Sequence, residues 1–244
     1  MFVFPGIALN RGLIYLAAAV VPALVLMIYI YNHDKTEKEP GKLLLRCVAG
    51  GCLSAFAAMI LETGATWLMD WYFSRHGATE VQYAVMTAIM VGLCEEGAKY
   101  FFLKRATWKS PEFNYLFDGM VYAVFVSLGF AALENILYVF SYGNLSVALQ
   151  RAVLTIPAHA SFAVYMGIFY ARAKNMEVIG NAYGAMMNQW LAYLCAVFLH
   201  AVYDGAIMIG SDASMIFFYV FVIVLDIMVF RTIRHESKTD RPIY

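Results

Sequence analysis

Four groups of polar residues interrupt the apolar stretches of this 244-residue chain, and each could take part in acid–base chemistry. The first group is Glu95, Glu96 and Lys99, in the segment VGLCEEGAKYFF. On a helix, Lys99 would lie one turn from both carboxylates, because it is i+4 from Glu95 and i+3 from Glu96. Adjacent carboxylates repel, and one lysine cannot neutralise both, so the pattern favours unequal protonation of the two glutamates and suits a general base. The alternative is a structural ion pair at a membrane interface.

A second group combines an imidazole with a carboxylate. His200 and Asp204, in the segment FLHAVYDG, are four residues apart and would share one face of a helix. A carboxylate in that position can hold the tautomer and the orientation of an imidazole, as it does for catalytic or metal-bound histidines. A purely structural pair is the alternative.

The remaining two groups are single polar sites within apolar surroundings. Glu134 and Asn135 lie in FAALENIL, and His159 follows Pro157 in TIPAHASF. A proline inside a helix can bend it and release backbone carbonyl groups, which helps to open a polar cavity. The alternatives are a protonated Glu134 and a His159 that each bond a neighbouring helix.

Together, these groups provide what amide hydrolysis requires. A carboxylate could deprotonate a water molecule, and imidazole or amide donors could stabilise the oxyanion that forms. The sequence contains neither a GxSxG nor an HExxH motif, so it indicates neither a serine hydrolase nor a classical zinc protease. We expect no cofactor, with zinc as the alternative, because Glu134, His159 and His200 could supply three ligands and leave the fourth position to water.

The composition predicts that lipid surrounds most of the chain. Hydrophobic residues make up 62% and charged residues 14%, against roughly 45–50% and about 25% in soluble domains. Seven segments are apolar and long enough to cross a bilayer: 13–31, 43–68, 82–103, 119–140, 148–171, 190–209 and 214–233. We therefore expect an all-α, polytopic transmembrane helical bundle that forms a single domain over residues 1–244, with its catalytic core at about 82–209.

The distribution of positive charge predicts the orientation of the bundle. Lysines and arginines gather in alternate loops and in the tail: Lys35, Lys38, Lys42, Lys104, Arg105, Lys109, Arg172, Lys174, Arg231, Arg234, Lys238 and Arg241. Positive residues stay on the cytoplasmic side, so the amino terminus should lie outside and the carboxyl terminus in the cytoplasm. The net charge of zero provides no basic surplus for binding a nucleic acid.

Other residues in the predicted spans have a simpler explanation. Glu62 and Asp226 are single acids that we expect to pair with another helix, and Arg151 is close enough to an interface to snorkel. Several spans contain small residues, namely Gly50, Gly51, Gly92, Gly97, Gly129 and Gly167. Small residues let transmembrane helices approach closely, which predicts a tightly packed bundle.

Four motifs, taken in order along successive predicted spans, resemble the PrsW family of bacterial membrane proteases. They are EEGAK at 95–99, FAALEN at 130–135, His159, and HAVYD at 200–204. That family is a branch of the larger CAAX-protease and bacteriocin-processing superfamily. The similarity covers roughly residues 90–205, and four motifs in this order are far more specific than any one alone. The resemblance implies a glutamate-type intramembrane endopeptidase in the bacterial cell (inner) membrane.

The resemblance also implies roles for individual residues. Glu95 would be the general base, with Glu96 and Lys99 tuning it. His200 would contact the water or the oxyanion, and Asp204 would orient His200.

The later glutamate and a second histidine would complete the site. His159 would be a further donor, beside Glu134 and Asn135. Glu134 stands where the wider superfamily often has histidine, in an FxxxH pattern that here reads Phe130 to Glu134. This substitution fits the PrsW branch and leaves the metal question open.

The implied substrate is a single-span membrane protein similar to an anti-sigma factor. Its first cleavage would lead, after a second cut, to release of a sigma factor in a stress response. That first cut would be extracytoplasmic, whereas the predicted topology places Glu95 and Glu96 nearer the cytoplasmic end. The alternatives from other classes are a proton-coupled transporter, although no internal repeat is visible, and a noncatalytic membrane scaffold.

Overall fold

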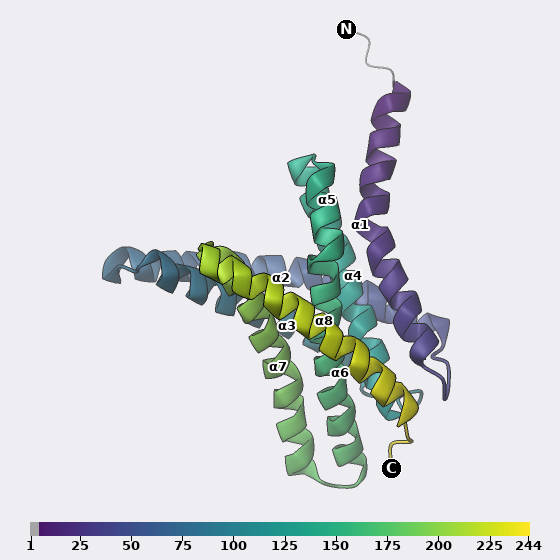
Figure 1. Cartoon of the computed structure of the whole chain (residues 1–244). Coiled ribbons are helices and arrows are strands. Elements are labelled where there is room, and N and C mark those ends of the chain that lie inside the picture. Colours follow the sequence, from purple (N-terminus) through teal and green to yellow (C-terminus); the bar gives the residue numbers. More distant parts are fainter. Residues whose placement is uncertain (1–4) are drawn as a thin grey trace.

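The computed structural model describes residues 5–244, and the side chains from residue 12 onward. Helices account for nearly all of this part of the chain (Figure 1). In order they are α1 (Pro5–His33), α2 (Gly41–His76), α3 (Glu80–Thr107), α4 (Leu116–Tyr142), α5 (Leu145–Val153), α6 (Thr155–Val178), α7 (Ala182–Ile209) and α8 (Asp212–Lys238). The predicted all-α fold is confirmed.

Six of the helical segments are long and apolar enough to cross a membrane, with α5 and α6 together counting as one. The helix outside this group is α3, whose 28 residues include the charged Glu95, Glu96 and Lys99. All seven predicted spans lie within helical segments. The polytopic membrane fold is therefore confirmed, and the charge in α3 has to be explained by what that helix contacts.

One predicted span differs in detail, because residues 148–171 form two helices in place of one. The break is at Leu154, between α5 and α6. Pro157 lies three residues further on, and its missing N–H and its ring disfavour an uninterrupted helix through this point. The break lies close to Arg151 of α5, which contacts Glu134 of α4.

Helix α4 is the centre of the bundle, since an unbroken run from Phe117 to Ala131 is buried. It packs against α2 and α6 at distances that only glycine permits. A Cβ atom on Gly51 would lie 2.0 Å from the carbonyl oxygen of Val126, and one on Gly167 would lie 2.5 Å from Cα of Met120. The predicted close packing at Gly51 and Gly167 is confirmed.

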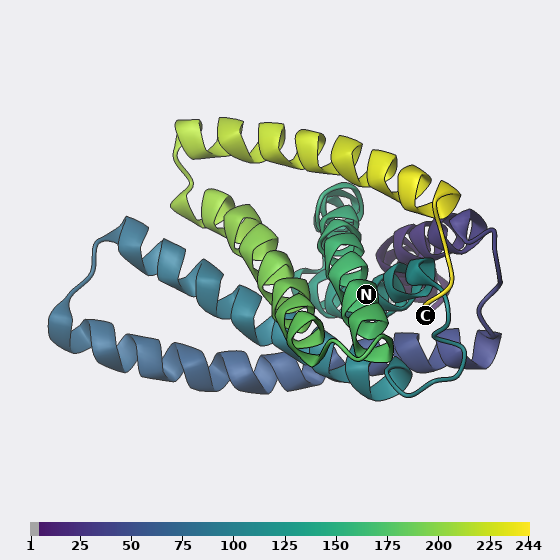
Figure 2. The same cartoon turned by 90° about the horizontal axis from the view of Figure 1, so that it is seen from below.

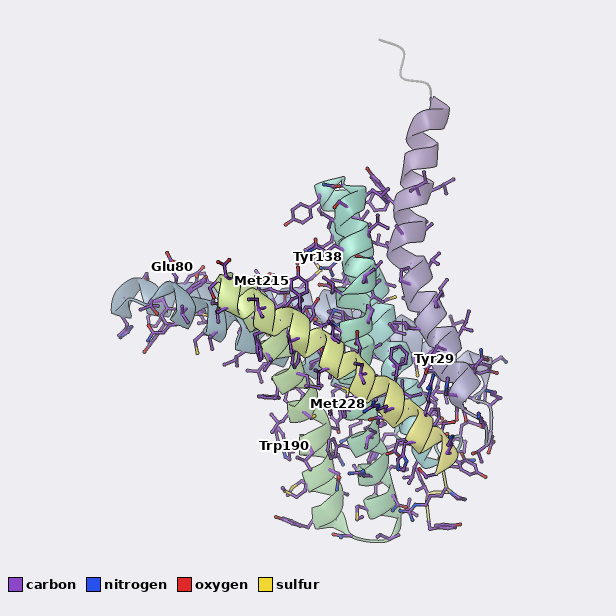
Figure 3. All side chains as sticks on the ribbon, in the orientation of Figure 1. Tyr29, Glu80, Tyr138, Trp190, Met215 and Met228 are labelled. Carbon is purple, nitrogen blue, oxygen red and sulfur yellow. The ribbon has the colours of Figure 1, made fainter. Side chains whose placement is uncertain are left out.

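The helices diverge from this centre. In Figures 1 and 2, α2 and α3 form a long hairpin that extends to one side, while α1 and the α6–α7 hairpin extend elsewhere. Many outward-facing side chains are apolar, as lipid contact requires. Trp190 and Met228, labelled in Figure 3, are 55% and 50% exposed.

Four segments that are distant in sequence meet at one end of the molecule. Leu116 N donates to Arg241 O at 3.1 Å, and the hydroxyl of Ser237 donates to His33 O. The indole Nε1 of Trp108 donates to Glu177 Oε2 at 3.1 Å. The α1–α2, α3–α4 and α6–α7 connections and the tail therefore share one side, which is the pattern expected when an even number of spans separates them.

Two acids in the α1–α2 loop at this end are almost completely buried. Asp34 is 1% exposed and Glu39 is 4% exposed. Burial raises the pKa of Asp34 to about 6 and that of Glu39 to about 7.

Candidate active site

The first side of the site is formed by α3, whose start is held by a reciprocal cap. Gln82 N donates to the Thr79 hydroxyl at 3.2 Å, and Thr79 N donates to Gln82 Oε1 at 2.9 Å. Further along α3, Gly92 lets α7 approach, because a Cβ atom there would lie 3.1 Å from Val197 O and 3.7 Å from Cβ of His200. This close approach brings the Glu95–Glu96 pair of α3 against the histidine of α7.

Lys99 occupies the middle of the charged group. Its Nζ lies 3.0 Å from Glu95 Oε2, 2.7 Å from Glu96 Oε1 and 3.1 Å from His159 Nδ1. It also lies 3.9 Å from the centre of the Phe130 ring, and only 1% of the residue is exposed. The predicted contacts of Lys99 with both glutamates are therefore present, and His159 is a third contact that helical spacing does not indicate.

The imidazole of His200 lies between carboxylates. Nδ1 is 2.8 Å from Glu96 Oε1, and Nε2 is 3.2 Å from Asp204 Oδ2 and 3.9 Å from Glu95 Oε2. The predicted His200–Asp204 contact is present. Glu96 contacts one ring nitrogen and Asp204 the other, so these two carboxylates together fix the orientation of the ring.

The second histidine connects α6 to α3 and α4. His159 Nε2 is 3.2 Å from Glu134 Oε2, and the hydroxyl of Ser127 donates to the His159 carbonyl at 2.9 Å. The His159 and His200 rings are nearly perpendicular, with centroids 5.4 Å apart. Glu134, His159 and His200 thus lie in one connected group with the acids of α3.

Arg151 was expected to snorkel, and the structure places it inside this network. Its Nη2 donates to Glu134 Oε2 at 2.7 Å, and its Nε donates to Asn135 Oδ1 at 3.0 Å. Asn135 in turn donates from Nδ2 to Ala19 O at 3.2 Å. Asn135 is therefore used to hold Arg151 and α1, and it does not line the cavity described next.

The charged group borders a cavity of about 570 Å³ between α2, α3, α4, α5, α6 and α7. Its polar lining consists mainly of Glu62, Glu95, Glu134, Arg151, His159, His200 and Asp204. Glu96 and Lys99 lie behind this surface, with 0% and 1% exposed. Of the two adjacent glutamates, only Glu95 faces the space where a substrate and a water molecule could bind.

Sequence reasoning did not assign Glu62 or Arg151 to the site. Both are ionisable residues in apolar segments, and that scarcity was the available signal. Neither residue has another residue of the site three or four positions away on its own helix. Glu62 belongs to α2 and Arg151 to α5. Only the packing of those helices shows that both line the cavity.

Four of these residues could in principle hold a metal ion. One ligand atom from each of Glu95, Glu96, His159 and His200 lies within 4.8 Å of the other three. The set of oxygen and imidazole donors is of the kind that zinc takes.

The arrangement of the donors does not fit an open zinc site, however. The ammonium group of Lys99 contacts Glu95, Glu96 and His159. Both ring nitrogens of His200 face carboxylates, so a metal could bind this ring only by replacing one of these contacts. These residues form an ion-pair network in which one oxygen, Glu96 Oε2, is buried and has no hydrogen-bond partner among the described residues.

A helical bundle that encloses ionisable residues around a cavity indicates a membrane protein with a candidate site for proton-transfer chemistry. Comparison with known proteins gives the particular family. A family model described as "PrsW family intramembrane metalloprotease" matches residues 39–230. The chain belongs to the PrsW family, and it is a multi-pass bacterial membrane protease.

Relatives in several bacteria support this assignment over most of the chain. Protease PrsW of Clostridioides difficile is 33% identical over 85% of this chain and 84% of its own length. Protease PrsW of Geobacillus kaustophilus is 30% identical over 93% of this chain and 94% of its own length. No solved structure matches the chain.

Proposed function

We propose that this protein is an intramembrane endopeptidase in which Glu95 activates the attacking water. The observation that carries the proposal is that Glu95 is the only member of the Glu95–Glu96–Lys99 group to line the 570 Å³ cavity. A general base has to reach the proton that it removes, either directly or through one water. The position of Glu95 meets that requirement, and the positions of Glu96 and Lys99 do not.

The residues behind Glu95 would position it. Lys99 donates to Glu95 Oε2 at 3.0 Å, which fixes the carboxylate without using its other oxygen. Glu96 receives hydrogen bonds from Lys99 and His200 and so connects the base to the imidazole of α7. Their role is to hold the geometry of the site and to balance its charge.

The acid–base cycle would follow from these contacts. Glu95 takes a proton from water as the water attacks the scissile carbonyl carbon, and it later returns that proton to the departing amine nitrogen. His200, held by Glu96 and Asp204 with both ring nitrogens toward acids, and Arg151 supply positive charge along the cavity wall for the developing oxyanion. His159, fixed between Lys99 and Glu134, closes the site on the α6 side.

The proposed substrate is a single-span membrane protein similar to an anti-sigma factor, cut in the first step of a stress response. The cavity supports this because it extends from Glu95 to Tyr142 at the end of α4 and to Met208 at the end of α7. These ends are opposite to the side where the α1–α2, α3–α4 and α6–α7 connections meet. In the predicted topology that opposite side is extracytoplasmic, so a water-filled path would connect Glu95 to the compartment of the first cut.

The test is cleavage of a co-expressed single-span substrate. Glu95→Gln should abolish cleavage while the folded protein is retained at wild-type levels. Glu80→Gln is the matched control, because Glu80 is an exposed acid at the start of the same helix (Figure 3) and should leave cleavage unchanged. Full cleavage by Glu95→Gln would eliminate Glu95 as the base.

A further inference from the structure

A second cluster of buried acids lies away from the cavity, at the end of the molecule where the loops meet. It consists of Asp34 and Glu39 from the α1–α2 loop and Asp118 from the start of α4, and we call it the loop acid cluster. The three residues are 1%, 4% and 1% exposed. One carboxylate oxygen from each lies within 4.8 Å of the other two.

These three acids form no salt bridge with any lysine, arginine or histidine that the structure describes. Lys38, in the same loop, donates to the backbone carbonyls of Tyr31 and Asp34. Uncompensated buried charge is costly, so buried acids normally pair or coordinate a metal.

Hydrogen bonds satisfy only part of the cluster. Asp118 Oδ2 accepts from Tyr115 N at 2.7 Å and Asn114 N at 3.0 Å, and Glu39 Oε2 accepts from the Tyr122 hydroxyl at 2.5 Å. In contrast, Asp34 Oδ2 and Asp118 Oδ1 are buried and have no hydrogen-bond partner among the residues described here. The unpartnered Asp34 Oδ2 indicates a ligand independently of the clustering of the three acids. Asp118 and Glu39 each accept at least one hydrogen bond, whereas this oxygen of Asp34 accepts none from the described residues.

We propose that the loop acid cluster binds a divalent cation that prefers oxygen ligands, of the calcium or magnesium kind. Two oxygens on opposite sides of Ca²⁺ are up to about 5 Å apart, since each Ca–O distance is about 2.3–2.6 Å. The separations within the cluster fit around one such ion. Asn114 Oδ1 is a further buried oxygen without a partner among the described residues, and the backbone N–H of Asn114 donates to Asp118 Oδ2.

The bound ion would join parts of the chain that no covalent bond connects. It would link the α1–α2 loop to the first turn of α4, the helix whose other half carries Glu134. The site is distinct from the cavity of the proposed protease reaction, because none of its three acids lines that cavity. Its test is therefore a binding and stability experiment that does not depend on cleavage.

The experiment uses the full-length protein in lipid nanodiscs, stripped with a chelator and then titrated with Mg²⁺ alone or Ca²⁺ alone. Binding is followed by calorimetry and by the temperature of unfolding. Wild-type protein should show saturable binding with a stoichiometry of one and a higher unfolding temperature. The relative affinities of the two ions identify which one the site prefers.

Asp34→Asn should weaken binding about tenfold or more, because the number of charged ligands sets the affinity of such sites. It should not lower the unfolding temperature of the cation-free protein, since it removes an uncompensated buried charge. Glu80→Gln, which changes an exposed acid at the start of α3, is the control and should leave the affinity unchanged. The proposal is overturned if neither ion binds saturably, or if Asp34→Asn binds the ion as tightly as the wild-type protein does.

Discussion

Removal of Lys99 is the most informative perturbation of the candidate active site. In Lys99→Met the shape of the side chain is roughly kept, but Glu95, Glu96 and His159 lose contacts of 3.0, 2.7 and 3.1 Å. Removing one partner of a buried ion pair costs about 3–5 kcal/mol, because the remaining charge is uncompensated. Folded domains are stable by only about 5–15 kcal/mol, so this variant should retain a folded state with a small margin.

The cause of the lost stability can be tested by also removing one of the charges that Lys99 compensates. Glu96→Gln alone leaves Lys99 paired with Glu95, whereas Lys99→Met combined with Glu96→Gln leaves only Glu95 without its cation. Groups in direct contact show coupling energies of about 0.5–3 kcal/mol. We therefore expect the double variant to be more stable than the sum of the two single losses predicts, by an amount in this range.

The assay is reversible unfolding of each variant in mixed micelles, followed by circular dichroism. A comparison pair at a partly exposed site, Lys174→Met with Glu177→Gln, should show little coupling, because the Glu177 side chain is 46% exposed and solvent-exposed pairs contribute about 0–1 kcal/mol. Additive losses for Lys99→Met and Glu96→Gln would refute the interpretation that Lys99 compensates the charge of the glutamate pair.

Three further outcomes are expected. Gly51→Ala should destabilise the protein by about 3 kcal/mol or more through overpacking against α4, whereas Gly64→Ala, which meets no atom within 4 Å, should stabilise it slightly in the same unfolding assay. Elemental analysis of the purified protein should find less than stoichiometric zinc; stoichiometric zinc that His200→Ala removes would replace the proposed mechanism with a metal-dependent one. Arg151→Ala should reduce substrate cleavage by about tenfold or more while folding is retained, because Glu134 loses its 2.7 Å partner, and unchanged cleavage would show that Arg151 is dispensable.

The sequence by itself was sufficient to predict the membrane fold and the polar groups. Apolar segments of sufficient length can satisfy their backbone hydrogen bonds in lipid only as helices or closed barrels, so the seven spans could be located from composition and length. Contacts within one helix were predictable in the same way. The Lys99 contacts with Glu95 and Glu96, and the His200 contact with Asp204, follow directly from spacings of three and four residues.

Contacts between helices could be decided only by tertiary structure. The sequence does not specify that Arg151 turns toward Glu134, that Glu62 lines the cavity, or that Asn135 is used for structural hydrogen bonds. Each of these depends on how two helices cross, and the crossing depends on many weak packing contacts along their whole length. The same holds for the loop acid cluster, whose members are up to 84 positions apart and meet only because the bundle brings their loops together.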